Sequence, residues 1–186
     1  MLALVGLVAC GSPAEDARET SAKARVKAKS GQVWGRDLAQ ALGLFEWELC
    51  SELGRVDCLG EAHLITLGGV EAQRLGIDEP TPPTASAPIA ADRVALAACA
   101  ERLRLDREGP AVLFGPVLEK GATKGARREV VENLVRRVLS RDPTRSEVDG
   151  LVGLYDELEP IAAEPVSDWS VGACMVVATS LEALFY

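Results

Sequence analysis

The spacing of apolar residues in the C-terminal third of the chain predicts three consecutive helices. Residues 127–140 carry their apolar side chains on one broad stripe, the pattern of an amphipathic helix packed against others. Thr144 and Glu147 form the signature of a capping box, which predicts a helix over 144–158. A last helix is expected over 168–185. The short connections between these helices are typical of an all-α bundle.

The preceding part of the chain has a weaker pattern. Near-helical apolar spacing predicts helices over 36–52 and 92–105. The apolar patch 63–67 is compatible with one short strand. Residues 79–88 include four prolines in ten residues, which predicts an extended loop. The short apolar segment 109–120, broken by two prolines, has no assignment. The sequence therefore predicts a mainly α fold, a small helical bundle with a Pro-rich loop.

The N-terminus carries a short apolar run that ends in the tetrapeptide Leu7-Val8-Ala9-Cys10, followed by Gly11-Ser12. This arrangement resembles a bacterial lipoprotein signal (a lipobox). The resemblance implies that the thiol of Cys10 is diacylated, that the chain is cut before it, and that the lipid anchor holds the protein to a membrane of the cell envelope, on its periplasmic or outer face. The run is too short to span a bilayer. A buried N-terminal strand is the alternative.

Small, polar and oppositely charged residues follow the lipobox. Residues 11–32 include no aromatic side chain, so they lack the apolar surface needed to pack. We expect a signal peptide at 1–9, a flexible tether at 10–35 and a single helical domain at 36–186, with a C-terminal three-helix part at 127–186.

Four cysteines remain once Cys10 is set aside. An even number in an exported chain indicates two disulfides, for which three connectivities exist. Short separation favours Cys50 with Cys58, which leaves Cys99 to pair with Cys174. The alternative is a set of free, buried thiols.

Composition argues against nucleic acid as a partner. Hydrophobic residues make up 48% of the 186, enough for a core, while the formal charge is −8. Nucleic-acid binding favours a basic footprint instead. One local basic stretch exists, but acidic residues interrupt it, and a solvated helix face is the favoured interpretation. Its members are Arg127, Arg128, Arg136, Arg137, Arg141 and Arg145.

No residue pattern indicates an enzyme, a metal or a cofactor. His63 is the only histidine, and with Cys50 and Cys58 it gives three ligands at wide spacing, whereas a structural zinc site needs four. A disulfide loop beside a partly buried histidine is the favoured interpretation. The haem motif Cys-x-x-Cys-His, phosphate loops and hydrolase elbows are absent from the sequence, and no carboxylate pair stands out as acid and base.

Three tryptophans are the candidate ligand-binding residues, because an exposed indole can stack on a sugar ring. They are Trp34, Trp47 and Trp169. The positions of Trp47 and Trp169 within predicted helices favour core packing instead.

A second resemblance lies at the C-terminus. The string Leu139-Ser-Arg-Asp-Pro-Thr-Arg-Ser-Glu147 and the closing Thr179-Ser-Leu-Glu-Ala-Leu-Phe-Tyr186 resemble the C-terminal helices of secreted planctomycete- and myxobacterial-type proteins of unknown function that accompany cytochrome c-like modules. Ala183 stands where that closing run usually has Phe. The resemblance implies a structural helical module in an exported bacterial protein.

Together these features predict a non-enzymatic, lipid-anchored envelope protein that acts as an accessory or scaffold and binds an exported protein partner. The helical face and the loop at 68–90 would supply the surface. Two alternatives stay open. The first is a periplasmic small-molecule or glycan-binding lipoprotein, with the tryptophans and residues 60–80 lining a pocket. The second is an accessory to an exported cytochrome-type electron-transfer system.

Overall fold

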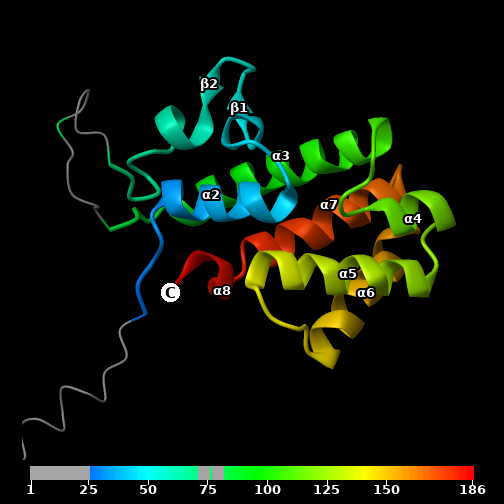
Figure 1. The fold of residues 1–186 in the computed structure, drawn as a ribbon. Coiled ribbons are helices and arrows are strands. Elements are labelled where there is room, and N and C mark those ends of the chain that lie inside the picture. The colour runs from blue at the N-terminus through cyan, green and yellow to red at the C-terminus, as the bar shows by residue number, and fades with distance from the viewer. Residues whose placement is uncertain (1–25, 71–75, 77–81) are drawn as a thin grey trace, which may run out of the picture.

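The computed structural model describes residues 26–70, 76 and 82–186 (Figure 1). The predicted signal, Cys10, most of the predicted tether and residues 79–81 of the predicted Pro-rich loop lie outside these residues. Within them the chain is mainly helical, with one pair of short antiparallel strands, so the mainly α prediction is confirmed. None of the described helices combines the length and apolar character needed to cross a bilayer.

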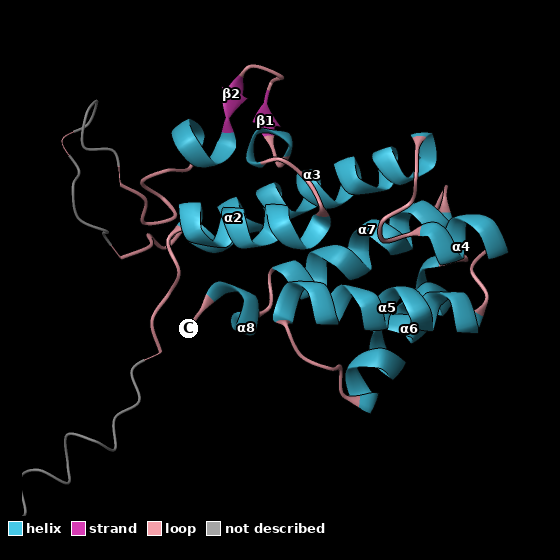
Figure 2. Cartoon of the chain, viewed as in Figure 1, coloured by secondary structure: helices cyan, strands magenta, loops and turns pink. Residues whose placement is uncertain are grey.

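The elements follow one another along the chain, and Figure 2 distinguishes helices from strands. In order, they are α2 (Gly31–Leu42), the 3₁₀ turn η1 (Glu46–Glu48), β1 (Ser51–Glu52), β2 (Val56–Asp57), the π turn η2 (Cys58–Ala62), α3 (Ala87–Glu108), α4 (Gly115–Lys120), α5 (Lys124–Leu139), α6 (Arg145–Leu158), α7 (Pro165–Ala178) and α8 (Leu181–Leu184).

Helix α7 is the centre of the bundle. Figure 1 shows it between α3 on one side and α5 on the other, and it packs against α6 as well. Trp169, Ala173 and Cys174 of α7 are fully buried. A helix apolar on most of its faces is stable only when neighbours cover it, which explains its central position.

Helix α2 begins earlier and ends earlier than predicted. The Ser30 side chain accepts a hydrogen bond from the amide of Val33, so the helix begins at Gly31, inside the range assigned to the tether. It ends at Leu42 because Gly43 adopts a left-handed conformation with φ 63°. The predicted boundary at residue 36 and the single helix over 36–52 are therefore wrong.

The first described segment is fastened to the C-terminus. Ala28 and Phe185 form an antiparallel bridge, in which the amide of Lys29 donates to the carbonyl of Leu184 over 2.9 Å. The amide of Tyr186 donates to the carbonyl of Lys27, also over 2.9 Å. The chain thus enters the domain beside the point where it ends (Figure 1).

The strand considered at 63–67 is a series of turns. Leu64 and Leu67 are buried three residues apart, a helix-like spacing that a strand would send to opposite faces. The amide of His63 donates to the carbonyl of Cys58 over 2.7 Å, which continues the turn from η2. The two strands lie earlier, at Ser51–Glu52 and Val56–Asp57.

The C-terminal helices follow the prediction at one cap and depart from it at another. The capping box forms, since Glu147 N donates to Thr144 Oγ1 over 3.3 Å and Thr144 N donates to Glu147 Oε2 over 2.7 Å. The predicted helix over 168–185 is interrupted, because Ser180 accepts from the amide of Ala183 and starts α8 anew. The chain beyond 127 therefore has four helices where the sequence predicted three.

Candidate functional site

An apolar groove lies where the first described segment meets the C-terminus. Two adjoining hollows, of about 290 Å³ and 400 Å³, share the residues Ala28, Lys29, Pro83 and Phe185. The walls come from three parts of the chain far apart in sequence, namely residues 26–31, the loop that leads into α3, and the region of α8.

The floor of the groove is set by a close approach of α2 to a turn. The amide of Gly31 donates to the carbonyl of Leu67 over 2.8 Å, and a Cβ on Gly31 would lie 2.5 Å from the Cβ of Leu67. Only glycine allows this contact. The side-chain amide of Gln32 also pairs with the backbone of Val70, donating over 3.0 Å and accepting over 3.2 Å. These bonds hold Leu67 beside Trp34, so both line the groove.

The two lysines of the groove differ in their engagement. Lys29 Nζ lies 2.9 Å from Asp37 Oδ2 and 5.6 Å from the ring centroid of Tyr186. The ammonium of Lys27 has no ion-pair partner among the described residues, and its side chain is exposed. Of the two lysines in the groove, Lys29 is therefore ion-paired, and Lys27 has no ion-pair partner among the described residues.

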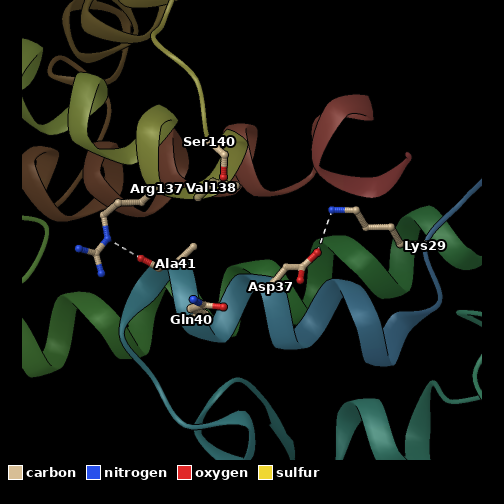
Figure 3. Close-up of a pocket in the computed structure, with 7 residues that line it drawn as sticks. All are labelled: Lys29, Asp37, Gln40, Ala41, Arg137, Val138 and Ser140. Atoms are coloured by element: carbon tan, nitrogen blue, oxygen red, sulfur yellow. Dashed lines mark hydrogen bonds and ion pairs between the residues drawn. The ribbon is translucent and has the colours of Figure 1, made fainter.

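A polar pocket of about 380 Å³ lies between α2 and the end of α5 (Figure 3). Figure 3 shows Lys29 directed toward Asp37, and Arg137 toward the backbone of Ala41. The Nε of Arg137 donates to the carbonyl of Ala41 over 2.5 Å, which satisfies one of the free carbonyls at the end of α2. Because Arg137 joins α5 to α2, and Lys29 joins the first described segment to α2, we assign this pocket a structural role.

The three candidate tryptophans lie in three different settings. Trp34 lines the groove but is only 2% exposed, and its indole N–H donates to the carbonyl of Ala178 over 3.1 Å. Trp169 is fully buried and donates to the carbonyl of Leu151 over 2.8 Å, as core packing requires. Trp47 is 72% exposed and contradicts the core interpretation.

Trp47 forms an exposed aromatic pair with Phe45. Their ring centroids are 4.4 Å apart and the rings are tilted by only 5°. Phe45 is 60% exposed. The amide of Phe45 donates to Glu48 Oε2 over 2.8 Å, which holds the turn η1 that carries both rings.

Both predicted cysteine pairs lie at disulfide distance. The Sγ atoms of Cys50 and Cys58 are 1.91 Å apart, and those of Cys99 and Cys174 are 1.92 Å apart. His63 turns to Glu52 instead of a metal site, with Nε2 at 3.2 Å from Glu52 Oε1. The described part of the chain holds no group of three or more metal-binding side chains.

The basic stretch is not uniformly solvated. Arg127 is buried, which corrects the prediction of a solvated face at this position. Its Nη1 donates to the carbonyl of Val152 over 2.7 Å and to Asp156 Oδ1 over 2.9 Å, and its guanidinium lies 4.5 Å from the ring centroid of Tyr155. Spacing along the chain does not indicate this burial, because the partners of Arg127 are on another helix, α6.

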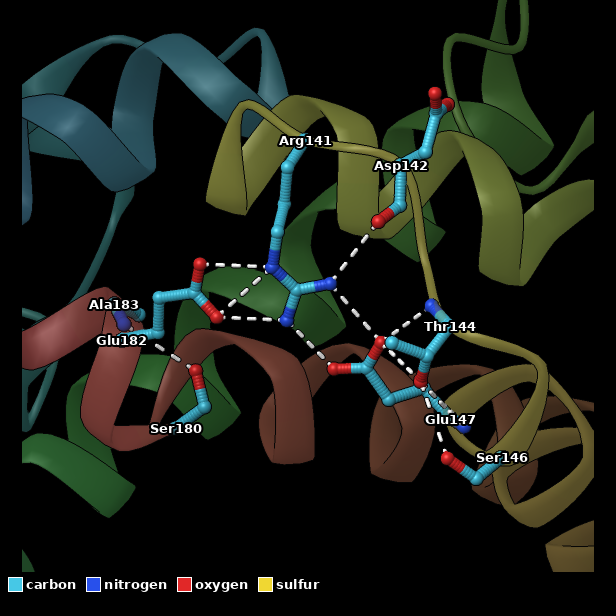
Figure 4. A network of polar contacts seen from close by, with 8 residues as sticks. All are labelled: Arg141, Asp142, Thr144, Ser146, Glu147, Ser180, Glu182 and Ala183. Atoms are coloured by element: carbon cyan, nitrogen blue, oxygen red, sulfur yellow. Dashed lines mark hydrogen bonds and ion pairs between the residues drawn. The ribbon is translucent and has the colours of Figure 1, made fainter.

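Arg141 joins the start of α6 to α8 (Figure 4). Its guanidinium contacts Glu147 at 2.6 Å and Glu182 at 2.7 Å. The hydrogen bond from Arg141, followed by that from the backbone of Thr144, lowers the pKa of Glu147 to about 2. The two carboxylates raise the pKa of Arg141 further above its ordinary value. With both carboxylates already engaged by this arginine, the network serves the fold.

Arg102 and Asp106 form a buried ion pair that was not predicted from the sequence. Asp106 accepts hydrogen bonds from the amides of Val112, Leu113 and Phe114 at 2.7–2.9 Å, and Arg102 lies 2.7 Å from it. The sequence feature that could have indicated this pair is the i, i+4 spacing of Arg102 and Asp106. Exposed ion pairs on a helix have the same spacing, so it does not indicate burial.

No family model, curated protein or solved structure matches the chain. The candidate sites therefore rest on their own geometry, which offers two surfaces: the exposed aromatic pair and the apolar groove.

Proposed function

We propose that this chain is a lipid-anchored, non-enzymatic protein of the bacterial cell envelope that binds another exported protein as an accessory or scaffold. The lipobox-like Leu7–Cys10 supports the anchor. The two cysteine pairs at disulfide distance support an oxidising compartment, where such bonds persist. The exposed aromatic pair supports the protein partner.

The stacked rings of Phe45 and Trp47 are the observation that carries this function. Both are more than half exposed, at 60% and 72%, and they gain little from the domain's own core. Tryptophan is enriched among residues that dominate binding energy at interfaces. The Glu48 hydrogen bond and the nearby Cys50–Cys58 pair hold the turn, so little conformational entropy remains to be lost on binding.

Site-specific photocrosslinking tests the partner. A photoreactive amino acid replaces Trp47 in the full chain, expressed in its own host, and Ile161 is the matched control because it is 80% exposed on another part of the surface. We expect discrete adducts with one exported protein from position 47 only. Identical adduct patterns from positions 47 and 161 would contradict the proposed surface.

Substitution of the lipidated cysteine tests the anchor. We expect Cys10→Ala to move the protein from the membrane fraction to the soluble fraction and to remove the diacylglyceryl mass, since Cys10 carries the proposed anchor. Ser12→Ala is the control and should stay with the membrane. Membrane fractionation of Cys10→Ala equal to that of the parent protein would reject the anchor.

Binding of a small apolar molecule is a second candidate function. The specific observation is that Trp34 and Leu67, from the predicted ligand-binding set and the 60–80 region, line the apolar groove. A stacked sugar requires an exposed ring face, whereas Trp34 is only 2% exposed. An apolar ligand therefore fits this groove better than a glycan.

A further inference from the structure

We infer that the groove beside the start of α2 binds a fatty-acid anion, with the aliphatic chain in the groove and the carboxylate next to Lys27. The inference rests on the second candidate function and names the class of ligand that it would take.

The shape and lining of the groove suit an aliphatic chain. It has two hollows, an inner one of about 290 Å³ lined by Trp34 and an outer one of about 400 Å³ lined by Val26, which adjoin through Ala28, Pro83 and Phe185. Ligand pockets in proteins commonly measure about 300–1,000 Å³. Trp34 and Leu184 contribute mostly carbon to the inner hollow. An alkyl chain placed there is stabilised because each CH₂ that it buries is removed from water.

The rim of the groove adds exposed apolar surface. Val26 lines the outer hollow and is 71% exposed, and Leu181 lines the inner hollow and is 76% exposed. A ligand chain that lies between them would cover both side chains. A bound peptide is a poorer fit, because its backbone would need hydrogen-bond partners that this mostly apolar lining does not offer.

The charge at the groove points to a single anion. Lys27 lines the outer hollow, and its ammonium forms no ion pair with any of the described residues. Lys29 is already paired with Asp37. No aspartate or glutamate is among the described residues that line either hollow, although the whole chain has a net charge of −8. The ammonium of Lys27 beside an apolar depression is complementary to a carboxylate that carries an alkyl chain.

Calorimetric titration of the full chain bearing Cys10→Ala tests the inference, because no acyl group of its own can then occupy the groove. The probes are dodecanoate, kept below the concentration at which it forms micelles, and the neutral dodecanol, kept below its solubility limit. We expect saturable binding of one dodecanoate per chain. Lys27→Ala should weaken dodecanoate binding about twofold to fivefold, as for an exposed ion pair, and leave dodecanol unchanged. Lys120→Ala is the control and should change neither.

Substitution at the rim separates the possible outcomes. Leu181→Glu, at a position 76% exposed, should preserve the fold and weaken both probes about tenfold or more, whereas Ile161→Glu, 80% exposed elsewhere, should not. No saturable binding of either probe overturns both this inference and the second candidate function. Dodecanol binding without a dodecanoate preference overturns the fatty-acid inference alone. Binding that Leu181→Glu leaves unchanged overturns the placement in the groove.

Discussion

Single buried charges hold the turns of this protein in place. Asp106 is the clearest case, because one carboxylate satisfies the amides of Val112, Leu113 and Phe114 and neutralises Arg102. A buried amide or charge without a partner costs far more than a hydrogen bond contributes. The single residue Asp106 therefore determines the path of the chain after the end of α3.

We predict that Asp106→Ala lowers the free energy of unfolding by about 3–5 kcal/mol, because it removes the counterion of the buried Arg102 and the acceptor of three backbone amides. Asp142→Ala is the control, since that side chain is 84% exposed, and it should change stability by less than about 1 kcal/mol. Urea unfolding measures both variants. Equal values for the two would show that the buried carboxylate contributes nothing special.

We predict that Glu147 makes the protein sensitive to acid. Its pKa in the folded state is about 2, below the ordinary value of 4.5, because Arg141 and the Thr144 amide bond to the charged form. Its contribution is therefore fully present above about pH 4.5 and is lost as the pH falls toward 2. Over this range the melting temperature of the parent should fall more steeply than that of Glu147→Gln.

The exposed Glu119→Gln is the control for this measurement and should follow the parent curve. Parallel curves for the parent and Glu147→Gln would rule out the stabilising role of the Arg141 network.

The helices themselves were predicted well where the signal is local. The Thr144–Glu147 capping box and the apolar stripe of α5 both act within one turn or one helix, so the sequence contains all that they need. The start of α2 was missed although its Ser30 cap is also local. What the sequence could not show is the contact of Gly31 with Leu67, which lie 36 positions apart.

We predict that Gly31→Ala destabilises the protein by about 1–3 kcal/mol, because the new Cβ would lie 2.5 Å from the Cβ of Leu67 and push α2 away from the turn. Gly125→Ala, in α5, meets nothing within 4 Å and should be neutral or stabilising by up to about 1 kcal/mol. Thermal unfolding of both variants is the measurement. A Gly31→Ala protein as stable as the parent would show that this approach is not tight.

The whole molecule is held together by connections between distant segments. The Cys99–Cys174 pair joins α3 to α7 across 75 positions, and the bridge between Ala28 and Phe185 joins the two ends of the described domain. Of the two, only the disulfide persists in the unfolded chain, which a long covalent loop restricts more than a short one does. Both connections also bring together the walls of the groove.

We predict that removing the long disulfide costs more than removing the short one. By loop entropy, the double substitution of Cys99 and Cys174 by alanine should cost about 4.5 kcal/mol, and that of Cys50 and Cys58 about 2.5 kcal/mol. Chemical unfolding measures the difference, and thiol counting in the denatured, unreduced parent should find these four cysteines bonded. Four free thiols would refute both bridges.

The sequence by itself determined the helical class, the Thr144–Glu147 capping box and the favoured cysteine pairing, because each depends on spacing along the chain or on the number of cysteines. Tertiary structure alone decided which side chains are buried. It buried Arg127 beside Asp156, left Trp47 exposed beside Phe45, and turned 63–67 away from a strand. The groove likewise forms only because three segments meet in space, namely residues 26–31, the loop before α3, and helix α8. Burial and concavity arise only from such contacts between segments that are far apart in sequence.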